Sequence, residues 1–186
     1  MPQLTLPQDL RSFVVLYVDD DAPNLSAFRA AFRKFCTILT AHSMQEGVAI
    51  LDSQPIDLLI TDQKMPHGTG LDLLRQTVDI YPDLKRCLIT AYGSHELIKE
   101  AINAGQIDWY LEKPWVDAEV LAIIRKAFTE TMLRENHRQL VNQLTRQLHE
   151  SHQLLLHLRS QFPTPLSEEV ESTLERLGQR LRRTTP

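Results

Sequence analysis

Three short apolar runs, far apart in the chain, each end in residues that carry charge. They are residues 14–18 before Asp19 and Asp20, residues 56–61 before Asp62, and residues 110–112 before Lys113. Apolar runs of this length, separated by helix-like segments, are typical of buried parallel strands. Ligands of an open parallel sheet bind beyond the carboxyl ends of its strands. We therefore expect three carboxylates and one ammonium to meet at one edge of one sheet.

The rest of residues 13–113 alternates in the same way. The expected strands are 13–18, 36–41, 56–61, 87–90 and 108–112, and each is followed by a helix-like segment. Ser43 and Glu46 have the spacing of a capping box, and Ser94 is the expected N-cap of the fourth helix. Five such units predict an α/β, doubly wound, five-stranded parallel sheet with right-handed crossovers.

The composition changes after about Phe128, beyond which no β-rich run appears. Glycine is absent between Gly105 and Gly178. One continuous helix is expected over about 117–161, and a heptad pattern begins at Val141. Its a and d positions are Val141, Leu144, Leu148, Ser151, Leu155, Leu158 and Phe162. Pro163 and Pro165 end this helix, and a short amphipathic helix is expected after them. A dimerising coiled coil is favoured over a poorly ordered linker helix.

These patterns divide the chain into four parts. They are an N-terminal extension at 1–11, an α/β domain at 12–128, a coiled-coil helix at 129–162 that continues the last helix of the domain, and a C-terminal helix at 163–186.

The carboxylates are suited to a hard divalent cation. Mg²⁺ prefers octahedral oxygen ligands and keeps some of its waters. Asp19, Asp20 and Asp62 supply carboxylates, and the backbone carbonyl of Lys64 can complete the protein's share. We therefore predict a Mg²⁺ site, in which Mn²⁺ can substitute.

The same edge is suited to phosphoryl transfer. Asp62 is the natural nucleophile, because a carboxylate can form a covalent phosphoryl intermediate. Charge on the phosphoryl oxygens must then be neutralised, and Lys113 supplies a point charge. Thr90, at the end of its own strand, offers a hydroxyl to another phosphoryl oxygen.

With these residues in place, the chain strongly resembles the receiver domain of two-component response regulators over about residues 12–128. The motifs that carry the resemblance are Val18-Asp19-Asp20-Asp21, Thr61-Asp62-Gln63-Lys64-Met65-Pro66 with Gly68 and Gly70, Thr90-Ala91-Tyr92, and Tyr110-Leu111-Glu112-Lys113-Pro114-Trp115. The resemblance implies the flavodoxin-like fold with sheet order 2-1-3-4-5. It also implies phosphorylation of Asp62 by a sensor histidine kinase, with Mg²⁺ held by Asp19, Asp20 and Asp62.

Three further expectations follow from the resemblance. Thr90 and Tyr110 form the switch pair, and the Lys113–Pro114 peptide is cis. Such a protein is a phosphoacceptor that catalyses only its own phosphorylation and dephosphorylation.

Residues 101–115 also look like those of receivers in hydrogenase-regulating transcription factors of the nitrogen-regulator class and in regulators joined to HD-GYP phosphodiesterases. The chain lacks the large effector of either, so it is either a receiver-and-helix fragment or a regulator whose output is its helical tail.

Two bulky residues, Lys64 and Tyr92, are expected to flank the path of the hydrolytic water. We hypothesise slow self-dephosphorylation, over minutes or longer; the alternative is that both are ordinary surface residues.

Three other functions fit the residues less well. A haloacid-dehalogenase-type enzyme needs a second aspartate two residues after the nucleophile, where this chain has Lys64. A phosphotransfer role for the tail, whose first helix carries His137, His149, His152 and His157, is also not favoured. The segment from His157 faintly resembles a kinase H-box, but the acidic residue that usually follows the histidine is missing there and the spacing is wrong. DNA binding through Arg176, Arg180, Arg182 and Arg183 is not expected, because the cluster is short and is better explained as a charged helix end.

The composition supports a cytoplasmic protein. The formal net charge of −4 provides no overall case for binding nucleic acid. Cys36 and Cys87 are expected to be buried, reduced thiols, and no apolar run approaches a membrane span of about 20 residues. The resemblance implies a sensor histidine kinase and an unidentified downstream protein as partners, and the heptad pattern predicts a second copy of the chain through the coiled coil.

Overall fold

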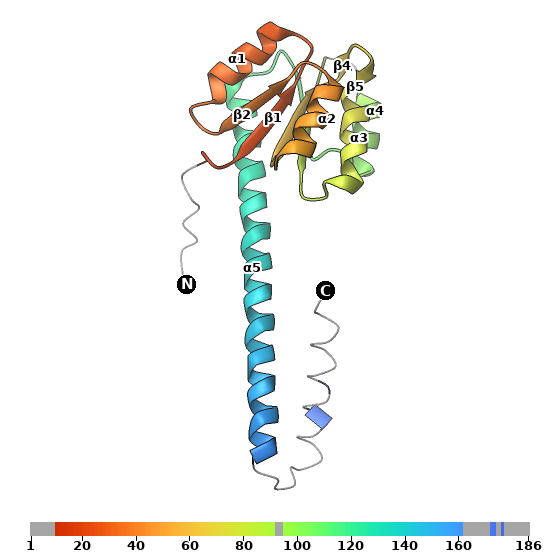
Figure 1. The fold of residues 1–186 in the computed structure, drawn as a ribbon. Helices are drawn as coiled ribbons and strands as arrows, with labels where there is room; N and C mark the ends of the chain where they lie inside the picture. The colour runs from red at the N-terminus through yellow and green to blue at the C-terminus, as the bar shows by residue number, and fades with distance from the viewer. Residues whose placement is uncertain (1–9, 92–94, 162–171, 174–175, 177–186) are drawn as a thin grey trace. The chain divides into compact units, whose positions relative to one another are not determined.

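The structure is a computed structural model and describes residues 10–91, 95–161, 172–173 and 176. The elements, labelled in Figure 1, are β1 (Val14–Val18), α1 (Ala22–Phe32), β2 (Thr37–Ala41), α2 (Met44–Ser53), β3 (Leu58–Asp62), β4 (Lys64–Met65), β5 (Gly68–Thr69), α3 (Gly70–Ile80), β6 (Lys85–Ala91), α4 (His95–Asn103), β7 (Trp109–Lys113) and α5 (Asp117–Gln161). The expected N-cap Ser94 and the expected C-terminal helix at 163–186 lie wholly or largely outside the described residues.

The main sheet has five parallel strands in the order β2-β1-β3-β6-β7. Counted without the small β4–β5 hairpin, this is the predicted order 2-1-3-4-5. The hairpin itself was not predicted, because two-residue strands are too short to show a periodic pattern. Its turn contains His67, which has a positive φ of 65°.

Helices cover both faces of the sheet, and each face has its own apolar core (Figure 1). One core joins β1, β3 and β6 to α1 and to the first turns of α5, including Phe28, Phe32 and Ile124. The other joins the opposite face to α2, α3 and α4, including Leu73, Leu74 and Ile98. Strand β3 is buried at all five positions, as its unbroken apolar run predicts. Both cysteines are buried and free.

Strand β6 begins at Lys85, two residues before the expected start at Cys87. The two charged residues were not expected in a buried strand, but both are buried and have partners. Arg86 donates hydrogen bonds of 2.6 and 2.7 Å to the carbonyl oxygens of Thr77 and Tyr81 at the end of α3. Lys85 pairs with Glu130 of α5 at 2.6 Å. Strand β6 can therefore begin two residues before its apolar run, because Lys85 and Arg86 find partners on α3 and α5.

The helix caps differ from the expected pattern in one place. Ser43 caps α2 by accepting from the Glu46 amide at 3.2 Å, but the Glu46 carboxylate accepts from the amide of His42. A complete capping box occurs instead at α3, between Thr69 and Asp72. Asp72 can take the acceptor role in place of the more common Glu or Gln at this position.

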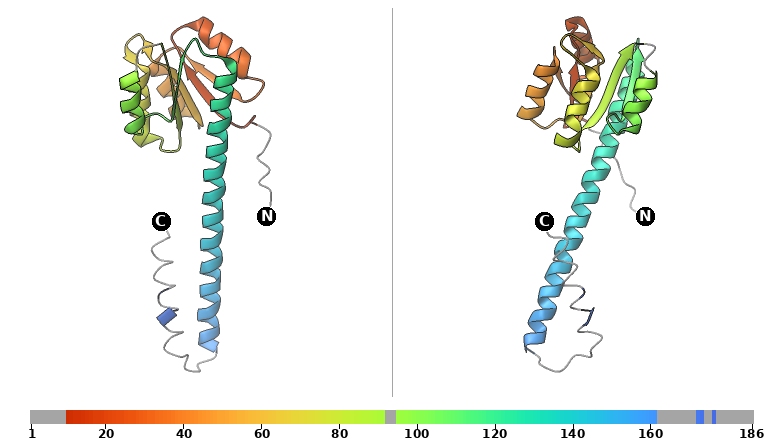
Figure 2. Two further views of the ribbon diagram at one scale, coloured as in Figure 1. Left: turned by 180° about the vertical axis from the view of Figure 1, so that it is seen from behind. Right: turned by 90° about the vertical axis from the view of Figure 1, so that its right-hand side faces the viewer.

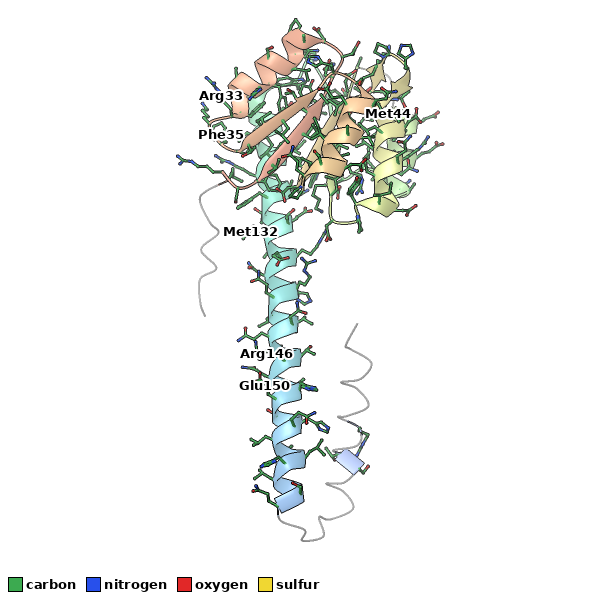
Figure 3. All side chains as sticks on the ribbon, in the orientation of Figure 1. Arg33, Phe35, Met44, Met132, Arg146 and Glu150 are labelled. Carbon is green, nitrogen blue, oxygen red and sulfur yellow. The ribbon has the colours of Figure 1, made fainter. Side chains whose placement is uncertain are left out.

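Helix α5 is continuous over Asp117–Gln161, as predicted (Figure 2). The chain divides into two compact units, and the first ends at Met132, which is labelled in Figure 3. The part of α5 in the first unit buries Val120, Ile124 and Ala127 in the core. From Leu133 onward the large apolar residues of α5 are exposed.

Candidate functional site

The predicted chemistry lies at the carboxyl edge of the sheet. Asp19 directly follows β1, Asp62 ends β3, Thr90 lies at the end of β6 and Lys113 ends β7. The strand register places these ends level with one another, since Val18 is opposite Thr61, Asp62 opposite Ile89, and Ala91 opposite Lys113. Parallel pairing thus brings together residues that are far apart in the chain.

Lys113 joins the two buried carboxylates of the site. Its ammonium lies 3.2 Å from Oδ2 of Asp19 and also forms an ion pair with Oδ1 of Asp62. Asp19 and Asp62 are 1% and 6% exposed, and carboxylates buried this far require a cation as partner. Partial burial by itself would lower the pKa of Lys113, but the hydrogen bond and charge of Asp62, followed by those of Asp19, raise it above its ordinary value. The lysine is therefore charged at any physiological pH.

Asp19 is held by several donors besides Lys113. Oδ1 accepts from the backbone amide of Asp21 at 2.9 Å, and Oδ2 accepts from the Tyr17 hydroxyl at 2.6 Å. The Asn24 amide reaches both oxygens, at 3.3 and 3.2 Å. Burial alone would raise the pKa of Asp19, but these hydrogen bonds and the charge of Lys113 together lower it. Asp19 is therefore an ionised, fully oriented carboxylate.

Asp62 is fixed through its side chain and its backbone. Its Oδ2 accepts from the Lys64 amide at 2.8 Å. A side chain on Gly70 would place its Cβ 2.9 Å from the carbonyl carbon of Asp62, so only glycine fits beside this peptide. Gln63 ties the start of α3 to the end of β3, because its backbone and side-chain oxygens accept from the amides of Gly70 and Leu71. The contribution of Gln63 was not anticipated, since no local pattern marks a glutamine that holds the next helix.

Thr90 is buried beside the ion pairs, and its hydroxyl donates to the carbonyl oxygen of Ala91 at 3.2 Å. Tyr110, the other member of the expected switch pair, is 40% exposed. Lys64 is also exposed, and Tyr92 lies outside the described residues. The Lys113–Pro114 peptide bond is cis.

The structure does not gather all the predicted metal ligands. Asp20 is exposed, and no three carboxylate, imidazole or thiol side chains among the described residues are close enough to form a metal cage. The donor set nevertheless fits a divalent cation, because two buried carboxylates share the single charge of Lys113. Their excess negative charge and hard oxygen atoms are what Mg²⁺ requires. The ligand set of Asp19, Asp20, Asp62 and the Lys64 carbonyl stays a prediction.

A parallel sheet with helices on both faces, and with an aspartate pair and a lysine at its carboxyl edge, defines a class of signalling domain. The family model that matches is the response regulator receiver domain, over residues 15–125. This match spans more than half of the chain, and the chain therefore belongs to the response regulator receiver family. Receivers are the phosphoryl-accepting domains of two-component regulators.

Curated relatives agree with this family. The chain is 33% identical over 113 residues to the hydrogenase transcriptional regulatory protein HoxA of Cupriavidus necator, a match of 61% of this chain and 23% of HoxA. It is 35% identical over 101 residues to the photosynthetic apparatus regulatory protein RegA of Cereibacter sphaeroides, covering 54% of each chain. The match therefore spans about a quarter to a half of the length of these relatives.

Solved structures show the same fold. A response regulator receiver domain from Clostridium thermocellum has a TM-score of 0.62 at 29% identity, covering 65% of this chain and 98% of that one. The receiver domain of an HD domain-containing protein from Pseudomonas fluorescens has a TM-score of 0.63 at 29% identity, covering 72% and 98%. The expected likeness to the receiver of a hydrogenase regulator is thus confirmed by HoxA, and the second of these structures is the receiver of an HD domain-containing protein. Among the described helices, none has the length and apolar character that a bilayer span requires.

Proposed function

We propose that this chain accepts a phosphoryl group on Asp62 from the phosphohistidine of a sensor histidine kinase. The observation that carries the proposal is the sharing of Lys113 by Asp62 and Asp19 at the carboxyl edge of the sheet. A buried aspartate carboxylate that is held in place by a neighbouring cation is suited to act as a nucleophile. The chain's own catalysis is limited to its phosphorylation and dephosphorylation.

In the transfer step, a carboxylate oxygen of Asp62 attacks phosphorus, the P–N bond to histidine breaks, and a P–O bond forms. The histidine nitrogen leaves with the bonding electrons and takes up a proton. The Lys64 amide orients the Asp62 carboxylate through its 2.8 Å hydrogen bond. Lys113 then neutralises charge on the phosphoryl oxygens, and the Thr90 hydroxyl provides a further hydrogen bond.

Mg²⁺, or Mn²⁺ in its place, would be held by Asp19, Asp20, Asp62 and the Lys64 carbonyl, and would neutralise further charge on the transferred group. Asp19 already has its orientation set by protein donors, so little rearrangement is required there. Asp20, which is exposed, would turn toward the site.

The test is phosphorylation of the full chain with acetyl phosphate and MgCl₂, followed by intact-mass spectrometry. The wild type should gain one phosphoryl group, and Asp62→Asn should gain none. Asp79→Asn, which removes an exposed carboxylate from α3, is the matched control and should behave like the wild type. Equal labelling of Asp62→Asn and the wild type would refute the assignment.

The proposal extends to the switch. A phosphoryl group adds about −1.5 to −2 charges at Asp62, and Thr90 moves toward its oxygens. This vacates space into which Tyr110, now 40% exposed, turns. Because β7 ends four residues before α5 begins, the change alters the start of α5. The slow dephosphorylation hypothesis for Lys64 and Tyr92 predicts a phosphoryl lifetime of minutes in the same assay.

We further propose that the distal part of α5 pairs with a second copy of the chain, so that the receiver at 12–128 continues into a coiled-coil helix at 129–162. The seam residues are Val141, Leu144, Leu148, Leu155 and Leu158, which are 42–51% exposed. Leucines at 3-4 spacing on an exposed helix favour association through a coiled coil. The ion pair Arg146–Glu150, labelled in Figure 3, lies outside the seam positions.

A pair of charge-matched variants tests the dimer. Leu148→Lys places a lysine in the seam, and Gln153→Lys places one at an exposed heptad position outside it. Light scattering of the full chain should show loss of the dimer for Leu148→Lys only. The same mass for both variants would reject the seam.

The proposed output is contact with a downstream protein in the cytoplasm. This proposal is supported by the names of HoxA and RegA, which are both regulatory proteins.

A further inference from the structure

Tyr17 is a buried tyrosine in the middle of a strand that is otherwise aliphatic. It lies two residues before Asp19, so both side chains leave the chain on the same face of the sheet. Tyr17 is 0% exposed, and its ring stacks on Phe28 with centroids 4.2 Å apart. Phenylalanine would provide the same ring packing. The hydroxyl must therefore be explained by what it contacts.

The hydroxyl contacts Oδ2 of Asp19 at 2.6 Å, which is shorter than the bonds from Asp21, Asn24 and Lys113 to the same carboxylate. An ionised carboxylate can only accept, so the Tyr17 hydroxyl is the donor in this bond. A buried hydroxyl without a partner is costly, and Asp19 supplies that partner.

The donors to Asp19 differ in how freely they can move. Lys113 divides its ammonium between Asp19 and Asp62, and in the proposed transfer it turns toward the phosphoryl oxygens. Tyr17 cannot turn, because its ring is packed in the core against Phe28. When Lys113 moves, Tyr17 still holds Oδ2 of Asp19.

We propose that Tyr17 is a positioning residue, whose hydroxyl orients the Asp19 carboxylate for a divalent cation; this inference rests on the proposed function. Hydrogen bonds to a ligating carboxylate set its direction and thereby the affinity of the site. A donor that cannot move keeps Oδ2 of Asp19 in one place while the Asp21 amide holds Oδ1, so the carboxylate keeps its orientation at the sheet edge when Lys113 moves.

The experiment is calorimetric titration of the full, unphosphorylated chain with MgCl₂. Tyr17→Phe removes one oxygen atom and keeps the ring. We expect a dissociation constant for Mg²⁺ about 10-fold weaker than that of the wild type. Tyr81→Phe is the matched control, since it also removes a tyrosine-to-aspartate hydrogen bond, that from Tyr81 to Asp52, and its dissociation constant should be unchanged.

Two further measurements separate positioning from a general loss of structure. Urea unfolding in EDTA shows whether Tyr17→Phe is folded, and replacement of Tyr17 by 4-aminophenylalanine restores a donor at the same place. Recovery of Mg²⁺ affinity with the amino group supports positioning, and absence of recovery overturns it. The fluorescence of Trp115, whose ring lies 5.9 Å from that of Phe28, offers a second readout of binding.

The outcomes also separate this inference from the proposed function. If Asp62 is phosphorylated and Tyr17→Phe binds Mg²⁺ as tightly as the wild type, the inference fails and the proposed function stands. If the wild type binds no Mg²⁺ and Asp62 accepts no phosphoryl group, both fail.

Discussion

Replacing Gly70 with alanine should disturb the phosphoacceptor directly. The new Cβ would overlap the carbonyl oxygen of Asp62, and it would lie 2.9 Å from the carbonyl carbon of Asp62 and 3.0 Å from Cδ1 of Leu88. An ordinary carbon–carbon contact is about 3.5 Å or more, so the start of α3 must move by at least about 0.6 Å. The carbonyl belongs to the backbone of a buried strand, so no side-chain rotation can relieve the clash.

The displacement also strains two hydrogen bonds, from the amides of Gly70 and Leu71 to the backbone and side-chain oxygens of Gln63, both 3.1 Å long. Overpacking costs about 1–3 kcal/mol, and each weakened hydrogen bond costs roughly 0.5–1.5 kcal/mol. We expect Gly70→Ala to lose about 2–4 kcal/mol of unfolding free energy. Phosphorylation by acetyl phosphate should also slow, because the Asp62 backbone is displaced.

Gly105→Ala is the control for a glycine change elsewhere. Gly105 has a φ of 67° and nothing within 4 Å of an added Cβ, so its cost is backbone strain alone, about 1 kcal/mol. Urea unfolding followed by tryptophan fluorescence measures both variants. The reasoning is refuted if Gly70→Ala is as stable as the wild type, or if it is destabilised less than Gly105→Ala.

Three further predictions concern groups away from the phosphoacceptor. Burial raises the pKa of Asp57, despite a 2.8 Å hydrogen bond from the Val14 amide, so its ionised form destabilises the folded state. Stability from this group is gained as the pH falls through the raised pKa toward the ordinary value of about 3.9. Asp57→Asn should therefore raise the urea midpoint most at pH 7 and progressively less toward pH 4; a difference that grows with acidity contradicts this. Arg86→Met should cost about 3 kcal/mol in urea unfolding, since it removes the three hydrogen bonds that the guanidinium donates to the carbonyl oxygens of Thr77, Tyr81 and Leu84. A loss under about 1 kcal/mol would show that these bonds are replaced. Burial raises the pKa of Cys36 to about 11 and also raises the pKa of Cys87. A thiol reagent at pH 8 should therefore label neither cysteine until urea unfolds the chain. Rapid labelling of the native protein would contradict the protection of the two thiols.

Much of the α/β fold is readable along the chain because its causes are local. The apolar runs of β1 and β3, with helix-like segments between them, indicate buried parallel strands. The length of α5 follows from a stretch without proline or glycine between Pro114 and Pro163. The site residues are readable too, because parallel strands end at one edge, so residues at strand ends must be neighbours.

Contacts between distant segments were not readable in the same way. Lys85 and Arg86 interrupt the apolar pattern, and only their partners on α3, α5 and the Asp108 side chain explain why β6 begins there. The β4–β5 hairpin is too short for a periodic signal. The capping box expected at Ser43 is incomplete, because the carboxylate of Glu46 accepts from the amide of His42 and not from that of Ser43. A complete capping box, which was not expected, occurs at Thr69.

The sequence by itself determined which residues stand at the strand ends and how long the last helix runs, because spacing and side-chain type act over a few residues. Only the tertiary structure decided that Asp19 and Asp62 share Lys113, and that the ring of Tyr17 is fixed against Phe28 while its hydroxyl donates to Asp19. Lys113 is 94 residues from Asp19, and their distance depends on the closing of the whole sheet.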